Sequence, residues 1–340
     1  MYRSRNEEGS WRRPRSLGVR AAPSCVLLLT LATPASAADP GASSFNDPYD
    51  LPETPRPPTL PELTHPGVEA TTESTAGILT PPRGSDVVSV VQRFNFEVPF
   101  NARRWFLGAT YEFAGGEPPG GGIPKAVGGN LELYGRTVWA TRTGLACGGG
   151  FGLVIPAAVY GRSGDAENTA RAAATLRPWD DPFFEEGFAT LRPFFDVRDI
   201  DGRFVLQFRQ GLDLAFDVTD LPTYRVAALS ALYAGYLIGP VGVGVEAFEY
   251  YFIDAPVADD KRGVFLLSPS LRFLFPYVQP AVSAITNVAT PLSGNVDHFW
   301  GIRLAATIVW DTATRGLERD REAHPSASGA GGAEPSVDVR

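Results

Sequence analysis

The sequence predicts an all-β protein, an antiparallel transmembrane β-barrel of about 12 strands. The alternative is a soluble β-sandwich. Many segments alternate apolar and polar side chains with a period of two, which is typical of strands with one apolar and one polar face. The breaks between these segments are alternately short and long, as in outer-membrane barrels. The chain also begins with the pattern of a secretory signal.

Residues 87–113 carry the clearest alternation. Apolar side chains occupy most even positions from Val88 to Phe100, and apolar side chains resume at odd positions from Trp105 to Phe113. Each run is close to the length of about 9–11 residues that a tilted strand needs to cross a bilayer. We therefore expect two adjacent membrane-spanning strands, joined by a short turn near 101–103.

Residues 1–37 are predicted to be a cleaved signal peptide. A basic region containing Arg12 and Arg20 precedes the short apolar run 26–31, and a small-residue cleavage site follows at 35–37. Cleavage near Ala37 would remove Cys25 and leave Cys147 as the single cysteine of the mature chain, so no internal disulfide is expected.

The segments on either side of the predicted barrel, 85–311, have a different composition. Residues 38–84 are rich in proline and are predicted to be an extended linker, with a candidate first strand at about 68–79. Residues 312–340 are rich first in charged residues and then in Ser, Gly and Ala, and are predicted to be a disordered periplasmic tail.

The remaining strands are expected at 130–139, 145–155, 189–198, 204–217, 224–238, 240–253, 263–275, 277–289 and 299–310. The uncharged run 226–245 is long enough for a transmembrane helix, but Gly239-Pro240 interrupts it and favours two strands. These strands and the two in 87–113 make eleven, and bacterial barrels usually have an even number. The order of short and long breaks places the missing strand before Val87.

The breaks also predict which side each loop faces. The longer ones, 115–128 and 158–186 among them, are expected outside the cell, and the short turns on the periplasmic side. Four tryptophans then lie at predicted strand ends, where amphipathic rings meet the membrane interface. They are Trp105, Trp139, Trp300 and Trp310.

Charged side chains within the strands are predicted to face the lumen, because a charge facing lipid at mid-depth costs about 2–4 kcal/mol. Positive and negative residues are nearly balanced, so ion pairs that brace the interior and a substrate path both remain open. The candidates for the pore lining are Arg93, Glu97, Arg104, Glu112, Glu132, Arg136, Arg192, Asp196, Arg209, Asp213, Glu246, Arg272 and Arg303.

Residues 128–156 resemble outer-membrane barrels of the meta-pathway phenol-degradation family and related transporters of hydrophobic compounds. The resemblance lies in an uncharged glycine-rich strand that ends in proline, here Gly148 to Pro156. The family often continues with Thr-Gly, whereas this chain has Ala157-Ala158. The resemblance implies a barrel in the outer membrane of a Gram-negative bacterium and passage of small hydrophobic or aromatic molecules. It implies no catalytic residues.

Nothing in the sequence predicts catalysis, a metal site or a cofactor. Ser293, Asp297 and His298 are close in sequence, but a catalytic triad depends on geometry rather than on proximity along the chain. The net charge of −8 and the pI near 5.1 give no basis for nucleic-acid binding.

Two functional classes remain. One is a channel or transporter for small molecules, which are expected to include hydrophobic ones. The other is a non-transporting barrel with a structural, adhesive or anchoring role. The partners expected in either case are outer-membrane lipid, lipopolysaccharide and the barrel assembly machinery.

Overall fold

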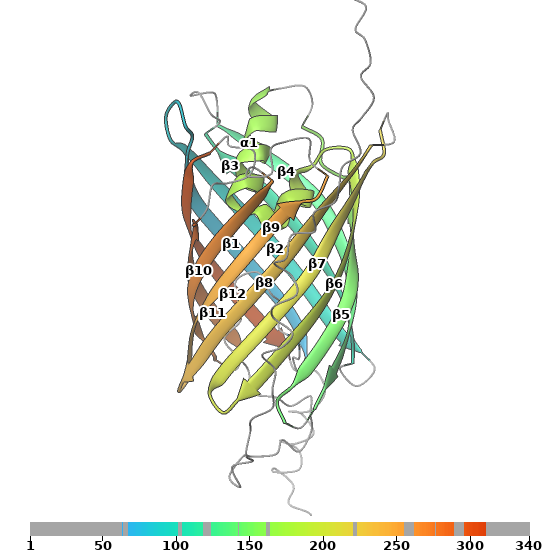
Figure 1. Cartoon of the computed structure of the whole chain (residues 1–340), viewed down its shortest axis with the longest axis vertical. Coiled ribbons are helices and arrows are strands. Elements are labelled where there is room, and N and C mark those ends of the chain that lie inside the picture. Colours follow the sequence, from blue (N-terminus) through green and yellow to red (C-terminus); the bar gives the residue numbers. More distant parts are fainter. Residues whose placement is uncertain are drawn as a thin grey trace, which may run out of the picture. The chain divides into compact units, whose positions relative to one another are not determined.

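The structure is a computed structural model that describes residues 63, 67–100, 104–117, 124–141, 143–160, 164–219, 223–254, 262–275, 277–288 and 296–310. The predicted signal peptide and the predicted C-terminal tail lie outside these residues. The described strands form one closed antiparallel barrel of twelve strands, in which each strand pairs with its neighbours in sequence and β1 pairs with β12 (Figure 1). The predicted fold class is confirmed.

The strands are β1 (Val68–Thr80), β2 (Val87–Phe100), β3 (Trp105–Gly116), β4 (Lys125–Ala140), β5 (Ala146–Ile155), β6 (Phe188–Asp201), β7 (Phe204–Asp217), β8 (Tyr224–Ile238), β9 (Val241–Phe252), β10 (Gly263–Phe273), β11 (Val278–Asn287) and β12 (His298–Trp310). The candidate first strand therefore exists, and it closes the barrel by pairing with β2 and β12. The run 226–245 forms β8 and β9, joined at Gly239, whose φ of 60° is the left-handed conformation that glycine tolerates in a tight turn.

Side chains that alternate between apolar and polar in the sequence face alternately outward and inward in the barrel. Apolar side chains such as Phe94, Leu107 and Phe151 are exposed on the outer face. Polar and charged side chains such as Glu97 and Arg136 are buried on the inner face. This distribution is the one expected where lipid surrounds the barrel, because lipid favours apolar surface and the interior holds the polar groups.

The four tryptophans at strand ends are all exposed on the outer face. Trp105, Trp139 and Trp310 lie at one end of the barrel, and Trp300 lies near the start of β12, at the opposite end.

Two prolines interrupt the hydrogen-bonded pairing of neighbouring strands. β6 and β7 pair at Leu191 with Leu214 and at Phe194 with Gly211, but not at the two positions between, where Pro193 lies. β10 and β11 show a similar gap at Pro269. Proline has no N–H to donate, so a gap in the ladder is the expected consequence.

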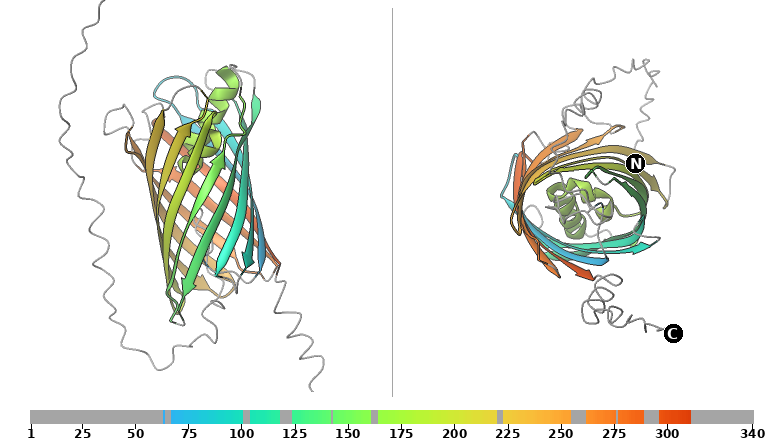
Figure 2. Two further views of the ribbon diagram at one scale, coloured as in Figure 1. Left: turned by 90° about the vertical axis from the view of Figure 1, so that its right-hand side faces the viewer. Right: turned by 90° about the horizontal axis from the view of Figure 1, so that it is seen from below.

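The predicted external loop 158–186 contains two helices instead of a simple loop. They are α1 (Gly164–Leu176) and the 3₁₀-helix η2 (Pro178–Phe184), and both lie inside the ring of strands when the barrel is viewed along its axis (Figure 2). Among the described residues, neither helix is long and apolar enough to cross a membrane.

Candidate functional site

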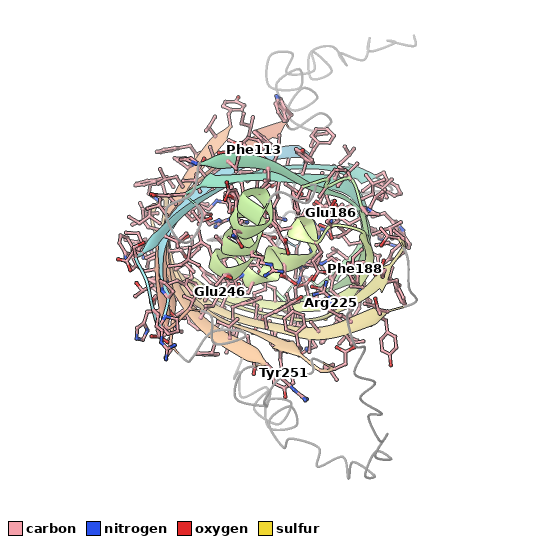
Figure 3. The ribbon with its side chains drawn as sticks, turned by 90° about the horizontal axis from the view of Figure 1, so that it is seen from above. Phe113, Glu186, Phe188, Arg225, Glu246 and Tyr251 are labelled. Carbon is pink, nitrogen blue, oxygen red and sulfur yellow. The ribbon has the colours of Figure 1, made fainter. Side chains whose placement is uncertain are left out.

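The segment between β5 and β6 forms a plug inside the ring of strands (Figure 3), in the half of the barrel that is uppermost in Figure 1. We call this the outer half, because the sequence predicts that it faces the outside. We define the plug as α1, Arg177 and η2. One face of α1 presents Ala166, Ala170 and Ala173, which are buried against residues that include Val91 of β2 and Val127 of β4. These small side chains at helical spacing let the helix approach the barrel wall closely. On the opposite side of the lumen, plug side chains pack in an apolar cluster from β8 to β12.

Arg177 is the electrostatic centre of the plug and has no exposed surface. Its Nε donates to Asp180 Oδ2 at 2.6 Å and its Nη1 donates to Thr75 Oγ1 of β1 at 2.9 Å. It also forms ion pairs with Glu73 of β1 and, at 3.8 Å, with Glu112 of β3. Burial would lower the pKa of Arg177, but the surrounding carboxylates raise it above its ordinary value, so the guanidinium remains charged.

Asn130 of β4 holds both ends of the plug segment. Its Nδ2 donates to the carbonyl oxygens of Pro182 at 2.9 Å and Glu185 at 2.8 Å. Its Oδ1 accepts from the backbone N–H groups of Ala157 and Ala158, each at 2.9 Å. The side chain is fully buried, so this single amide fixes where the segment enters and leaves the barrel.

The plug also contacts β6 and β9. Arg192 Nη2 of β6 donates to the Trp179 carbonyl oxygen at 2.7 Å. The Trp179 ring packs edge-on against Phe248 of β9, with ring centroids 5.4 Å apart. The plug is therefore held by directional contacts from several sides of the barrel rather than resting against one wall.

A cavity of about 130 Å³ borders the plug at Trp179 and Asp180. Five arginines and five carboxylates line it, so their formal charges sum to zero. They are Arg93, Arg136, Arg192, Arg209 and Arg303, and Glu73, Glu97, Glu132, Asp180 and Asp213.

The arginines of this lining already have partners. Arg136 donates to both oxygens of Glu97 at 2.9 and 2.6 Å, and Arg209 donates from two nitrogens to Asp196 at 2.7 and 2.8 Å. Arg192 Nε donates to Asp213 Oδ1 at 2.8 Å. The two-point pairs of Arg136 and Arg209 fix their planar guanidinium groups and satisfy their charge within the wall.

The rest of the cavity wall is aromatic and aliphatic. Phe194, Phe248, Leu229 and Ala231 contribute to it together with Trp179. Arg209 lies over the Phe194 ring, with its Cζ 4.1 Å from the ring centroid. The cavity wall therefore combines apolar surface with paired charges.

Leu63, which precedes β1, is also inside the barrel. It is fully buried in a cluster with Phe106, Val138 and other inward side chains of β3 to β7 near the inner end. Its carbonyl oxygen accepts a hydrogen bond from Arg136 Nη1 at 2.9 Å. Gly148 of β5 makes room for it, since a Cβ there would lie 3.0 Å from Leu63 Cδ2.

The thirteen candidates for the pore lining divide clearly by position. Twelve lie within strands on the inward-facing positions and are buried or partly buried. Arg104 is different, because it lies in the turn before β3 and is exposed, so it does not line the lumen. Four others are buried inside the barrel but do not line the cavity, namely Glu112, Asp196, Glu246 and Arg272.

Sequence reasoning missed the groups that hold the plug. Glu73 and Thr75 lie on β1, whose alternation is weak, and Arg177, Trp179 and Asp180 lie in the supposed loop. A signal for the helix was present, since Ala166, Ala170 and Ala173 recur at helical spacing. No group of metal-ligating side chains occurs among the described residues.

Comparison with known proteins identifies the fold but no family. No family model and no curated protein matches the sequence. The COG4313 outer membrane channel from Pseudomonas putida F1 superposes with a TM-score of 0.57 over 75% of this chain and 99% of that chain, at 13% identity. The NanC porin matches with a TM-score of 0.46 over 70% of this chain and 100% of its own, at 8% identity. The likeness to the first of these structures shows the fold, a closed antiparallel barrel like that of an outer-membrane channel.

Proposed function

We propose that the protein is an outer-membrane channel or transporter for small uncharged molecules, including hydrophobic ones. The observation that carries the proposal is the charge-balanced, partly aromatic cavity in the lumen next to the plug. Channels that select ions usually present an excess of one sign of charge. A lining with equal numbers of paired arginines and carboxylates gives no such preference and leaves the aromatic and aliphatic wall to contact the solute.

Passage along the axis requires the plug to move. The plug contacts inward side chains of β1 to β4 and packs against side chains from β8 to β12, so it obstructs the outer half of the lumen. Its contacts are non-covalent and its two ends continue into β5 and β6. The plug can therefore rearrange without disrupting the strand ladder, which supports a gated channel rather than a permanently open pore.

The same geometry supports a second candidate, a non-transporting barrel. Fully buried ion pairs such as Arg136 with Glu97, and the plug itself, brace the interior as a structural or anchoring barrel would need. For either function we infer placement in the outer membrane after removal of the signal peptide, with lipopolysaccharide and the barrel assembly machinery as partners.

Purified protein in planar bilayers and in liposomes distinguishes the two functions. A channel is expected to give discrete conductance steps with little preference between cations and anions, and to accelerate entry of small uncharged solutes. Protein that folds, as judged by heat-modifiable migration on gels, yet gives neither conductance nor solute entry would support the non-transporting barrel.

A further inference from the structure

Two arginines on the inner face of the barrel are held in the same way. Arg136 donates from Nε and Nη2 to Glu97, and Arg209 donates from Nε and Nη2 to Asp196. Each guanidinium also lies over a phenylalanine ring, with its Cζ 4.0 Å from the ring centroid for Arg136 and 4.1 Å for Arg209. In both arginines this arrangement leaves the third nitrogen, Nη1, for another acceptor.

The two arginines differ in what occupies that third position. Arg136 Nη1 donates to the carbonyl oxygen of Leu63 at 2.9 Å, and the Arg136 side chain is only 1% exposed. Arg209 Nη1 has no hydrogen-bond partner among the described residues and is not one of the buried polar atoms. The Arg209 side chain is 15% exposed and lines the cavity. Its free N–H groups are therefore accessible to a molecule in the lumen.

Apolar side chains lie directly beside this free donor. The strand register places Arg209, Ala231 and Phe248 next to one another on β7, β8 and β9. Phe194 lies under the guanidinium, and Leu229 is the neighbouring inward residue on β8. All five residues line the cavity, and we call them the Arg209 corner.

The Leu63 contact shows which group this arrangement accepts. At Arg136 the third acceptor is a neutral carbonyl oxygen, and the leucine that carries it is buried in an apolar cluster with Phe106. The Arg209 corner offers the same combination of a guanidinium donor and apolar surface, with the acceptor position open. A free molecule that joins a carbonyl oxygen to an apolar body matches it.

The charge of the corner favours an uncharged molecule. Asp196 already compensates the charge of Arg209 through two hydrogen bonds. A carboxylate at Nη1 would add a negative charge without a counter-charge, and its removal from water would be costly. An ammonium group carries no acceptor for the free N–H groups.

We propose that the Arg209 corner is a solute-binding position, which selects small uncharged molecules that carry a hydrogen-bond-acceptor oxygen, such as a ketone or ester carbonyl, on an apolar body. The oxygen accepts from Arg209 Nη1, and the apolar body packs against Leu229 and Phe248. The inference rests on the proposed transport function and names its class of solute. It distinguishes oxygen-bearing molecules from hydrocarbons of the same shape.

Cyclohexanone and methylenecyclohexane test this preference, because the second has the shape of the first with CH₂ in place of oxygen. Their affinities for purified, folded barrel in micelles are measured by ligand-observed NMR, relative to protein-free micelles. A hydrogen bond from a charged donor should favour the ketone by about tenfold. Cyclohexanecarboxylate should bind more weakly than the ketone. Equal binding of ketone and hydrocarbon, or tighter binding of the carboxylate, would overturn the inference.

A double variant assigns the preference to the corner. Arg209→Met with Asp196→Asn removes the donor and its carboxylate together, so the net charge of the lumen is unchanged. It should lower the affinity for the ketone by about tenfold and leave that for the hydrocarbon unchanged. The control is Phe208→Leu, which alters the adjacent, outward-facing residue of β7 that does not line the cavity. A preference that persists in the double variant would refute the assignment.

The carbonyl stretching band of cyclohexanone bound to native protein decides the matter if the double variant does not fold. Donation from a guanidinium should lower this frequency below its value in water, and a band at or above that value would overturn the inference. Transport is measured separately in the bilayer and liposome assays. Protein that prefers the ketone but admits no solute would overturn transport and leave the corner as a binding site. Protein that admits solute without the preference would overturn the inference alone.

Discussion

Replacing Arg177 with methionine tests whether charge holds the plug closed. Arg93, Arg177 and Arg303 lie among Glu73, Glu112 and Asp180, so three positive groups face three negative ones. Arg177→Met leaves one buried negative charge without compensation. Removal of one partner from a buried ion pair costs about 3–5 kcal/mol.

This loss of free energy should weaken the docking of the plug rather than the pairing of the strands. Each 1.4 kcal/mol is about a tenfold change in an equilibrium constant, so the ratio of docked to released plug should fall by roughly 10²-fold to several thousand-fold. In planar bilayers we expect native protein to be mostly closed and Arg177→Met to be mostly open. The variant should still migrate as a folded, heat-modifiable barrel.

Arg171→Met is the matched control. Arg171 lies on the same helix, its side chain is 72% exposed, and it pairs with Glu167 one turn away. A surface pair of this kind contributes at most about 0.5 kcal/mol, so conductance should remain native.

A second change restores the charge balance in the Arg177→Met protein. Adding Glu112→Gln removes one carboxylate from the same cluster, and this should recover part of the closed state. Our account of the plug would be refuted if Arg177→Met conducted like native protein, or if Arg171→Met opened the channel equally.

Three further changes test other parts of the structure. Glu185 directly follows the plug, and burial and the adjacent Asp181 carboxylate raise its pKa well above the ordinary 4.5. Its carboxyl group therefore holds a proton more strongly when the plug is docked than when the segment is released. Docking should then weaken as pH rises above about 4.5, with more open channel toward neutral pH and a flattened response in Glu185→Gln. Phe208→Arg places a charge on the lipid-facing side at a cost of about 2–4 kcal/mol and should abolish folding in lipid vesicles; a native yield would show that the register is off by one residue. Leu63→Asp places a charge beside Phe106, and the cost of burying that charge should displace residue 63 from the lumen and raise single-channel conductance. Native conductance would mean that Leu63 does not obstruct the lumen.

The strands could be predicted from the sequence because their signal is local. The alternation within this one strand is enough to predict that Phe94 faces lipid and Glu97 faces the lumen. The argument from an even strand number then located β1, although its own pattern is weak. Arg104 shows the limit of this reasoning, since the alternation assigned it to the lumen but it lies in the turn before β3.

The plug could not be predicted because its placement depends on distant residues. The partners of Arg177 come from β1 and β3, and Asn130 of β4 fixes both ends of the segment. Helical spacing of alanines indicates a helix but not the surface against which it packs. The general pattern of long external loops in barrels predicted a long connection at 158–186 but not its folding into the lumen.

The attachment of the plug at both ends has a consequence for how the barrel closes. Because the segment is continuous with β5 and β6, its docking is intramolecular, and its effective concentration near its own site is on the order of millimolar. Closure therefore does not require a high intrinsic affinity, and a released plug returns quickly. A separate peptide with the sequence of 157–187, added to a barrel that lacks the segment, would have to reach a comparable concentration before it closed the lumen.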